Sequence, residues 1–139
     1  MKIERLMTTR LITVDMDVTL KEIRDLFEKA SFHHLLVTEN GKLVGIISDR
    51  DILKWSSPFI GTLQERPADE HLLLKRAHQL MTRKPITLCR TESVTKALQL
   101  LVDNKLSSLP ITNPDGSLAG IVTARDFLKF MLNMATNTL

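Results

Sequence analysis

The stretch Gly45–Asp51, which reads GIISDRD, returns 75 residues later as Gly120–Asp126, which reads GIVTARD. The repeat extends well beyond this motif, because residues 7–54 match residues 81–129 with a shift of one position in a single turn. A fixed internal period indicates one supersecondary unit that is used twice, and such a unit usually cannot bury its apolar face alone. We therefore expect two half-domains that share one core.

The first copy has the pattern of a strand, a helix, two strands and a second helix. Thr19 and Glu22 have the spacing of a capping box, and apolar residues follow them at helical intervals. Asn40-Gly41 lies between two apolar runs, which is a strong hairpin signal. The predicted elements are a strand at 11–14, a helix at 19–30, strands at 35–38 and 43–47, and a helix that Ser48 opens.

The second copy repeats this order. Its predicted elements are a strand at 85–88, a helix at 93–104, strands at 109–112 and 118–122, and a last helix that Thr123 opens. That last helix is apolar on more than one side, so its end either packs on another chain or closes the core. Between the copies, 56–67 is predicted as a loop and 69–80 as a helix.

Size and composition set limits on the class of protein. A chain of 139 residues has the length of one domain. The net charge of +3 is mild and Tyr is absent, which argues against nucleic-acid binding by basic patches with stacking aromatics. Cys89 is the only cysteine, and no apolar run approaches a membrane span or a signal peptide. We therefore expect a cytoplasmic protein.

Together these features resemble a tandem pair of CBS (cystathionine-β-synthase) domains, known as a Bateman module. The hairpin leading into Gly-Ile-Ile/Val-Ser/Thr-x-Arg-Asp occurs at corresponding positions of both copies, and Leu109-Pro110-Ile111 is similar to the family's Leu-Pro-Val second strand. Leu36 stands where the first copy should have that proline. Nothing else is attached to the pair, so it resembles a stand-alone CBS-domain protein.

The resemblance implies an α/β (α+β) fold. Two β-α-β-β-α units would pack through their sheets into one module with pseudo-twofold symmetry. The sequence divides into a first unit at 1–57, a connector loop and helix at 58–76, and a second unit at 77–139.

The resemblance also implies two clefts for adenine nucleotides or related adenosyl ligands. Asp51 and Asp126 would accept hydrogen bonds from ribose hydroxyls, and Ser48 and Thr123 would donate to a phosphate. Backbone groups near Ile12 and Ile86 would contact the adenine edge. His34 would face a phosphate, and Ser108 occupies the matching position of the second copy. Further phosphate contacts are implied for four basic residues: Arg10, Arg50, Lys84 and Arg125.

Elementary chemistry supports these roles but also offers an alternative. A helix N-terminus attracts anions, and a carboxylate can accept both donors of a vicinal diol. However, Ser48-x-x-Asp51 and Thr123-x-x-Asp126 are also ordinary capping boxes, which stabilise a helix by about 1 kcal/mol and bind nothing. The duplication of the whole hairpin and motif favours ligand sites.

The expected function is regulation without catalysis. The protein would bind AMP, ADP, ATP or an S-adenosyl compound, would form a homodimer and would control an unknown partner. The alternative is a ligand-independent dimerisation scaffold. No catalytic group, metal site or obligatory cofactor is expected, and neither a membrane nor nucleic acid is an expected partner. The sequence leaves open the nucleotide, the cleft that is filled, the regulated protein and the orientation of the dimer.

Overall fold

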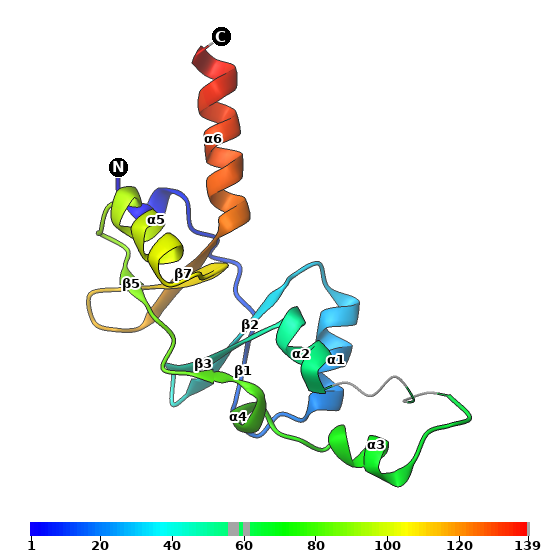
Figure 1. The fold of residues 1–139 in the computed structure, drawn as a ribbon. Coiled ribbons are helices and arrows are strands. Elements are labelled where there is room, and N and C mark those ends of the chain that lie inside the picture. Colours follow the sequence, from blue (N-terminus) through cyan, green and yellow to red (C-terminus); the bar gives the residue numbers. More distant parts are fainter. Residues whose placement is uncertain (56–58, 60–61, 139) are drawn as a thin grey trace. The chain divides into compact units, whose positions relative to one another are not determined.

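The computed structural model describes residues 1–55, 59 and 62–138. The chain divides into two compact units (Figure 1). Residues Ile12–Lys84 form one, which we call the first-copy unit; Met1–Leu11 together with Pro85–Leu139 form the other, the second-copy unit. Both combine a sheet with helices, so the predicted mixed α/β fold is confirmed.

The first-copy unit is built on a four-stranded sheet in the order β1-β2-β3-β4. Strand β1 pairs parallel with β2, and the other neighbours pair antiparallel. Its core contains Leu20, Ile23, Leu35 and Ile47, contributed by one helix and the central strands. The elements are β1 (Thr13–Val14), α1 (Leu20–Lys29), β2 (His34–Glu39), β3 (Lys42–Ser48), α2 (Asp49–Trp55), α3 (Pro67–Leu72), α4 (Ala77–Leu80) and β4 (Thr82–Arg83).

The second-copy unit has a three-stranded sheet in the order β5-β6-β7, again with one parallel and one antiparallel pair. Its core includes Leu101, Leu109, Ile111 and Phe127. The elements are the 3₁₀ helix η1 (Ile3–Arg5), β5 (Leu88–Cys89), α5 (Val94–Asp103), β6 (Ser108–Thr112), β7 (Leu118–Thr123) and α6 (Ala124–Thr138).

Local chemistry explains why these elements form where the sequence predicts them. Thr19 and Ser93 cap α1 and α5, because each hydroxyl accepts a hydrogen bond from the backbone N–H three residues on. Asn40 and Gly41 both adopt positive φ, which the tight turn between β2 and β3 requires. The first strand of each copy is shorter than predicted and starts later.

The two lead-in segments are exchanged between the copies. Thr8, which precedes the first strand of the first copy, pairs through both backbone groups with Ile121 of the second. In the same way, β4 precedes the second copy's first strand but pairs with β3 of the first copy. The side chain of Ile3 is fully buried in the core of the second-copy unit. The units formed in space therefore differ from the repeats in the sequence, whose boundaries at 57 and 76 stay a prediction.

The connector corrects one prediction. A single helix at 69–80 is wrong, because the helical structure is interrupted between α3 and α4. Arg76 is extended there and bridges to Thr19, and Ala77 N–H donates to the carbonyl of Val18. These tertiary backbone bonds replace the bonds of a continuous helix.

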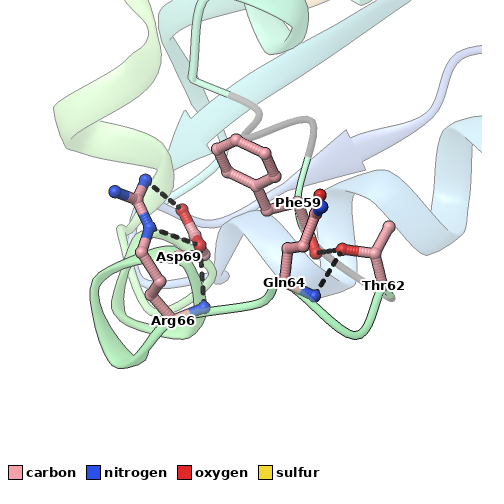
Figure 2. Close-up of polar contacts among 5 residues, drawn as sticks. All are labelled: Phe59, Thr62, Gln64, Arg66 and Asp69. Carbon is pink, nitrogen blue, oxygen red and sulfur yellow. Dashed lines mark hydrogen bonds and ion pairs between the residues drawn. The ribbon is translucent and has the colours of Figure 1, made fainter.

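The loop predicted at 56–67 lies in part outside the described residues. Figure 2 shows the part that is described. The guanidinium of Arg66 lies 5.1 Å from the ring centre of Phe59 and donates two hydrogen bonds to the buried carboxylate of Asp69. Thr62 accepts from Gln64 N–H and donates to the carbonyl of Phe59. Among the described residues, no helix is long and apolar enough to cross a bilayer.

Candidate functional site

The first candidate site lies where β3 runs directly into α2, which we call the Ser48 junction (Ser48–Asp51). The backbone N–H of Ser48 donates to Oδ2 of Asp51 over 2.9 Å, and the backbone N–H of Asp51 donates to Oγ of Ser48 over 3.1 Å. The side chains of both residues are half-buried. The predicted capping box is therefore present.

The second candidate site repeats this geometry where β7 meets α6, at the Thr123 junction (Thr123–Asp126). Thr123 N–H donates to Oδ2 of Asp126 over 2.8 Å, and Asp126 N–H donates to the Thr123 hydroxyl over 3.3 Å. The hydroxyl also donates to the same Oδ2. Within the described part of the chain, Oδ1 of neither Asp51 nor Asp126 is engaged, so each cap leaves one carboxylate oxygen available.

The second strand brings one further residue opposite each junction. His34 is paired in register with Ser48, and Ser108 is paired with Thr123. Both side chains are half-buried. The two sites thus share a backbone frame but differ in the side chain beside it, as the sequence comparison predicts.

The charges at the Ser48 junction are not reproduced at the Thr123 junction. Burial lowers the pKa of the His34 imidazole; His33 lowers it further, whereas the negative charges of Asp49 and Asp51 partly oppose the shift. His33 Nδ1 lies 2.8 Å from Oδ2 of Asp49. Residues 107 and 124 of the second copy, which correspond to His33 and Asp49, are serine and alanine. Sequence reasoning missed this hydrogen bond, although the difference between Asp49 and its alanine counterpart was a visible signal.

The backbone at the implied adenine positions also differs between the copies. The carbonyl of Ile12 accepts a hydrogen bond from Leu36 N–H over 3.1 Å. The matching donor in the second copy would be residue 110, but Pro110 has no N–H. Within the described residues the carbonyl of Ile86 accepts no bond. The replacement of the expected proline by Leu36 therefore has a physical consequence: the N–H of Leu36 occupies the carbonyl of Ile12, whereas Pro110 leaves the carbonyl of Ile86 without this donor.

The four basic residues of the prediction are all exposed, and none forms an ion pair with a described residue. Arg50 and Arg125 lie in the first turns of α2 and α6. Arg10 precedes the first strand of the first copy but belongs to the second-copy unit, which contains the Thr123 junction. Lys84 precedes the first strand of the second copy but belongs to the first-copy unit, which contains the Ser48 junction. Among the described residues, no group of three or more His, Cys, Asp or Glu side chains is placed to hold a metal ion.

Comparison with known proteins identifies the class. The CBS domain family matches residues 3–58 and again residues 77–133. A CBS domain-containing protein of Dictyostelium discoideum is 32% identical over 134 residues, which cover 95% of this chain and 92% of that protein. The chain belongs to the CBS domain family, and it carries two copies of the domain.

Solved structures agree with this assignment. The protein CBSX2, crystallised with AMP, matches with a TM-score of 0.78 and 26% identity, over 96% of this chain and 98% of that chain. A CBS domain pair crystallised with 5′-methylthioadenosine and S-adenosyl-L-methionine matches with a TM-score of 0.77 over 96% and 98%; at 24% identity it supports the fold alone.

Proposed function

We propose that the protein is a non-catalytic regulator that binds an adenosine-containing ligand at the Thr123 junction and, more weakly, at the Ser48 junction. The observation that carries the proposal is a pair of acceptors in the second-copy unit that no described residue uses: Oδ1 of Asp126 and the carbonyl of Ile86. A ribose diol and the exocyclic amine of adenine are donors that suit these two acceptors.

The capping box and the ligand site are compatible in this proposal. The cap uses Oδ2 of Asp126 and fixes the carboxylate, so Oδ1 is held in one orientation before a ligand arrives. A site that is already ordered loses less conformational entropy on binding. Thr123 and Arg125 then supply phosphate contacts at the first turn of α6, a helix of fifteen residues whose N-terminus favours anions.

The Thr123 junction is the principal site for two reasons. First, the carbonyl of Ile12, the adenine acceptor implied at the Ser48 junction, is already occupied by Leu36 N–H. Second, Asp49 adds a negative charge that the Thr123 junction does not have, and a phosphate would be repelled by it. The two sites therefore differ in affinity for phosphorylated ligands.

The AMP complex of CBSX2 supports AMP as the first ligand to test, and the S-adenosyl alternative rests on the resemblance seen in the sequence. Binding would regulate by population shift: the ligand favours one conformation of the pair and so changes the affinity for a regulated protein. The chain is expected to perform no chemistry of its own and to act in the cytoplasm.

Thermal melting with AMP, ADP, ATP and S-adenosylmethionine tests the proposal, with inorganic phosphate as the control ligand. A ligand at 100 times its dissociation constant adds about 2.7 kcal/mol to the free energy of unfolding, which gives a clear shift. The variant Asp126→Asn keeps an oxygen for the cap but loses the charge and presents an amide donor, so it should weaken binding about tenfold or more. Glu22→Gln alters a capping box outside both junctions and should leave affinity unchanged.

A ligand-independent scaffold is the second candidate function. The specific observation in its favour is that both carboxylates are turned onto backbone amides. It is the better account if no adenosyl compound shifts the melting curve.

A further inference from the structure

An open groove, which we call the α1 groove, lies beside the first strand of the first-copy unit. It has a volume of about 290 Å³, and its walls are helix α1 and the segment that leads from β1 into α1. Strand β1 ends the strand order of its sheet, so one of its edges has no neighbour among the described strands. The lining residues are Val14, Val18, Glu22, Asp25, Leu26 and Lys29.

The α1 groove combines apolar and charged side chains. Val14, Val18 and Leu26 are half-buried and pack against the core of the unit. Asp25 and Lys29 are exposed, and neither side chain forms a hydrogen bond or an ion pair with a described residue. The groove therefore offers an apolar floor beside two charges of opposite sign that the described part of the chain does not use.

The second copy satisfies its polar groups at the matching positions within its own chain. Lys96 Nζ lies 3.4 Å from Oε1 of Glu92, and Gln99 Nε2 donates to both carboxylate oxygens of Asp103. These four residues stand 74 positions after four of the residues that line the α1 groove. The fold thus permits internal pairing at this surface, and the first copy does without it.

We propose that the α1 groove binds an extended segment of the regulated protein, which adds as a strand to the open edge of β1. The segment presents apolar side chains to the groove, with one basic and one acidic side chain between them. The proposal rests on the proposed function for the regulatory role of this partner. Its test does not depend on AMP, because the groove is formed by the chain alone.

Spacing and charge both favour this occupant. Asp25 and Lys29 are four residues apart on α1, which corresponds to about 6 Å along the helix axis. Alternate side chains of an extended strand share one face at a spacing of about 7 Å. A Lys or Arg and an Asp or Glu two positions away can therefore meet both charges.

The open strand edge supports an extended rather than a helical segment. Unpaired strand edges accept a further strand through main-chain hydrogen bonds, and pockets for alternate side chains give such binding its specificity. Val14 belongs to β1 and lines the groove. A strand added beside it would direct every second side chain toward the same groove.

An NMR titration of the backbone amides tests the proposal with the capped peptide Thr-Val-Thr-Arg-Thr-Glu-Thr-Val-Thr. The Val, Arg and Glu side chains of this peptide share one face when it is extended. We expect chemical-shift changes at residues 13–18 and along α1. A second peptide with Ser in place of Arg and Glu should bind about fivefold more weakly, because it lacks both ion pairs.

Variants that copy the second copy test the two charges. Asp25→Gln with Lys29→Asp installs the α5 residues of the matching positions, so the unit should stay folded. Its affinity for the Arg and Glu peptide should fall about fivefold. The control is Glu28→Val, which also copies an α5 residue but at a position outside the groove lining, and it should leave the affinity unchanged.

Absence of binding, equal affinity for the two peptides, unchanged affinity in Asp25→Gln with Lys29→Asp, or shift changes confined to residues outside the groove would each overturn the proposal. Shift changes at the groove on dilution of the protein without peptide would assign the groove to a second copy and would also overturn it. Peptide binding to a protein whose melting curve AMP does not shift would instead count against the ligand proposal alone.

Discussion

One backbone donor separates the two candidate sites. Leu36 N–H closes the carbonyl of Ile12, and Pro110 cannot do the same for Ile86. The sequence shows that Leu36 stands where a proline is expected, but only the hydrogen-bond pattern shows which atom is affected. The residue types therefore predict the candidate sites, whereas their proposed ranking rests on the register of β1 on β2 and of β5 on β6.

Replacing Pro110 by the leucine of the first copy should lower the affinity of the Thr123 junction for AMP. Pro110→Leu supplies an N–H to the carbonyl of Ile86 and should weaken AMP binding about 5-fold, because one neutral hydrogen bond is worth about 1 kcal/mol. Calorimetric titration measures the change. Pro114→Leu, in the exposed turn between β6 and β7, is the control. Unchanged affinity in Pro110→Leu would show that the carbonyl of Ile86 makes no contact with the ligand.

His34 should make stability depend on pH. Because burial holds the pKa of His34 below 6.5, the unfolded chain takes up a proton at a higher pH than the folded chain does. The free energy of unfolding should therefore fall as the pH is lowered through about 6.5. His34→Ser, which copies Ser108, should reduce this loss in urea titrations between pH 8 and pH 5.5, and His33→Ser, which removes the neighbouring hydrogen bond to Asp49, is the control. Equal slopes for wild type and His34→Ser would contradict the assignment.

At the scale of elements, local sequence signals predicted the helix caps and the hairpin turn. They did not predict the features that depend on contacts between residues far apart in the sequence. The caps at Thr19 and Ser93 and the turn at Asn40-Gly41 are short-range chemistry, and all appear where expected. The break between α3 and α4 depends on backbone bonds to residues 16–20, which no helical periodicity can report. The pairing of each lead-in segment with the other copy also depends on backbone bonds that periodicity does not report.

The exchange of lead-in segments predicts where a core mutation acts. Ile3→Ala should destabilise the chain by about 2–5 kcal/mol, because Ile3 is fully buried. Its effect should appear in the second copy, although Ile3 precedes the first. Hydrogen exchange should show lost protection at β6 and β7 with β2 and β3 little changed.

Ile23→Ala, in the core of the first-copy unit, is the matched control and should give the opposite pattern. Equal loss of protection in both units after Ile3→Ala would contradict the division into two compact units.

At the scale of the whole chain, the two copies have the same fold but different surfaces. The first copy carries charge at the Ser48 junction and on α1. The second copy has, as far as the described residues show, an available acceptor at the Thr123 junction, and it has exposed apolar side chains on α5 and α6. If the proposal is correct, ligand binding relies mainly on the second copy.

The central claim is that the free oxygen of Asp126 accepts a ribose. A crystal structure of the protein with saturating AMP tests it most directly. The account predicts a ribose hydroxyl within hydrogen-bonding distance of Oδ1 of Asp126, with the adenine amine at the carbonyl of Ile86 and the cap on Oδ2 retained. An empty Thr123 junction, with AMP absent or bound elsewhere, would contradict it.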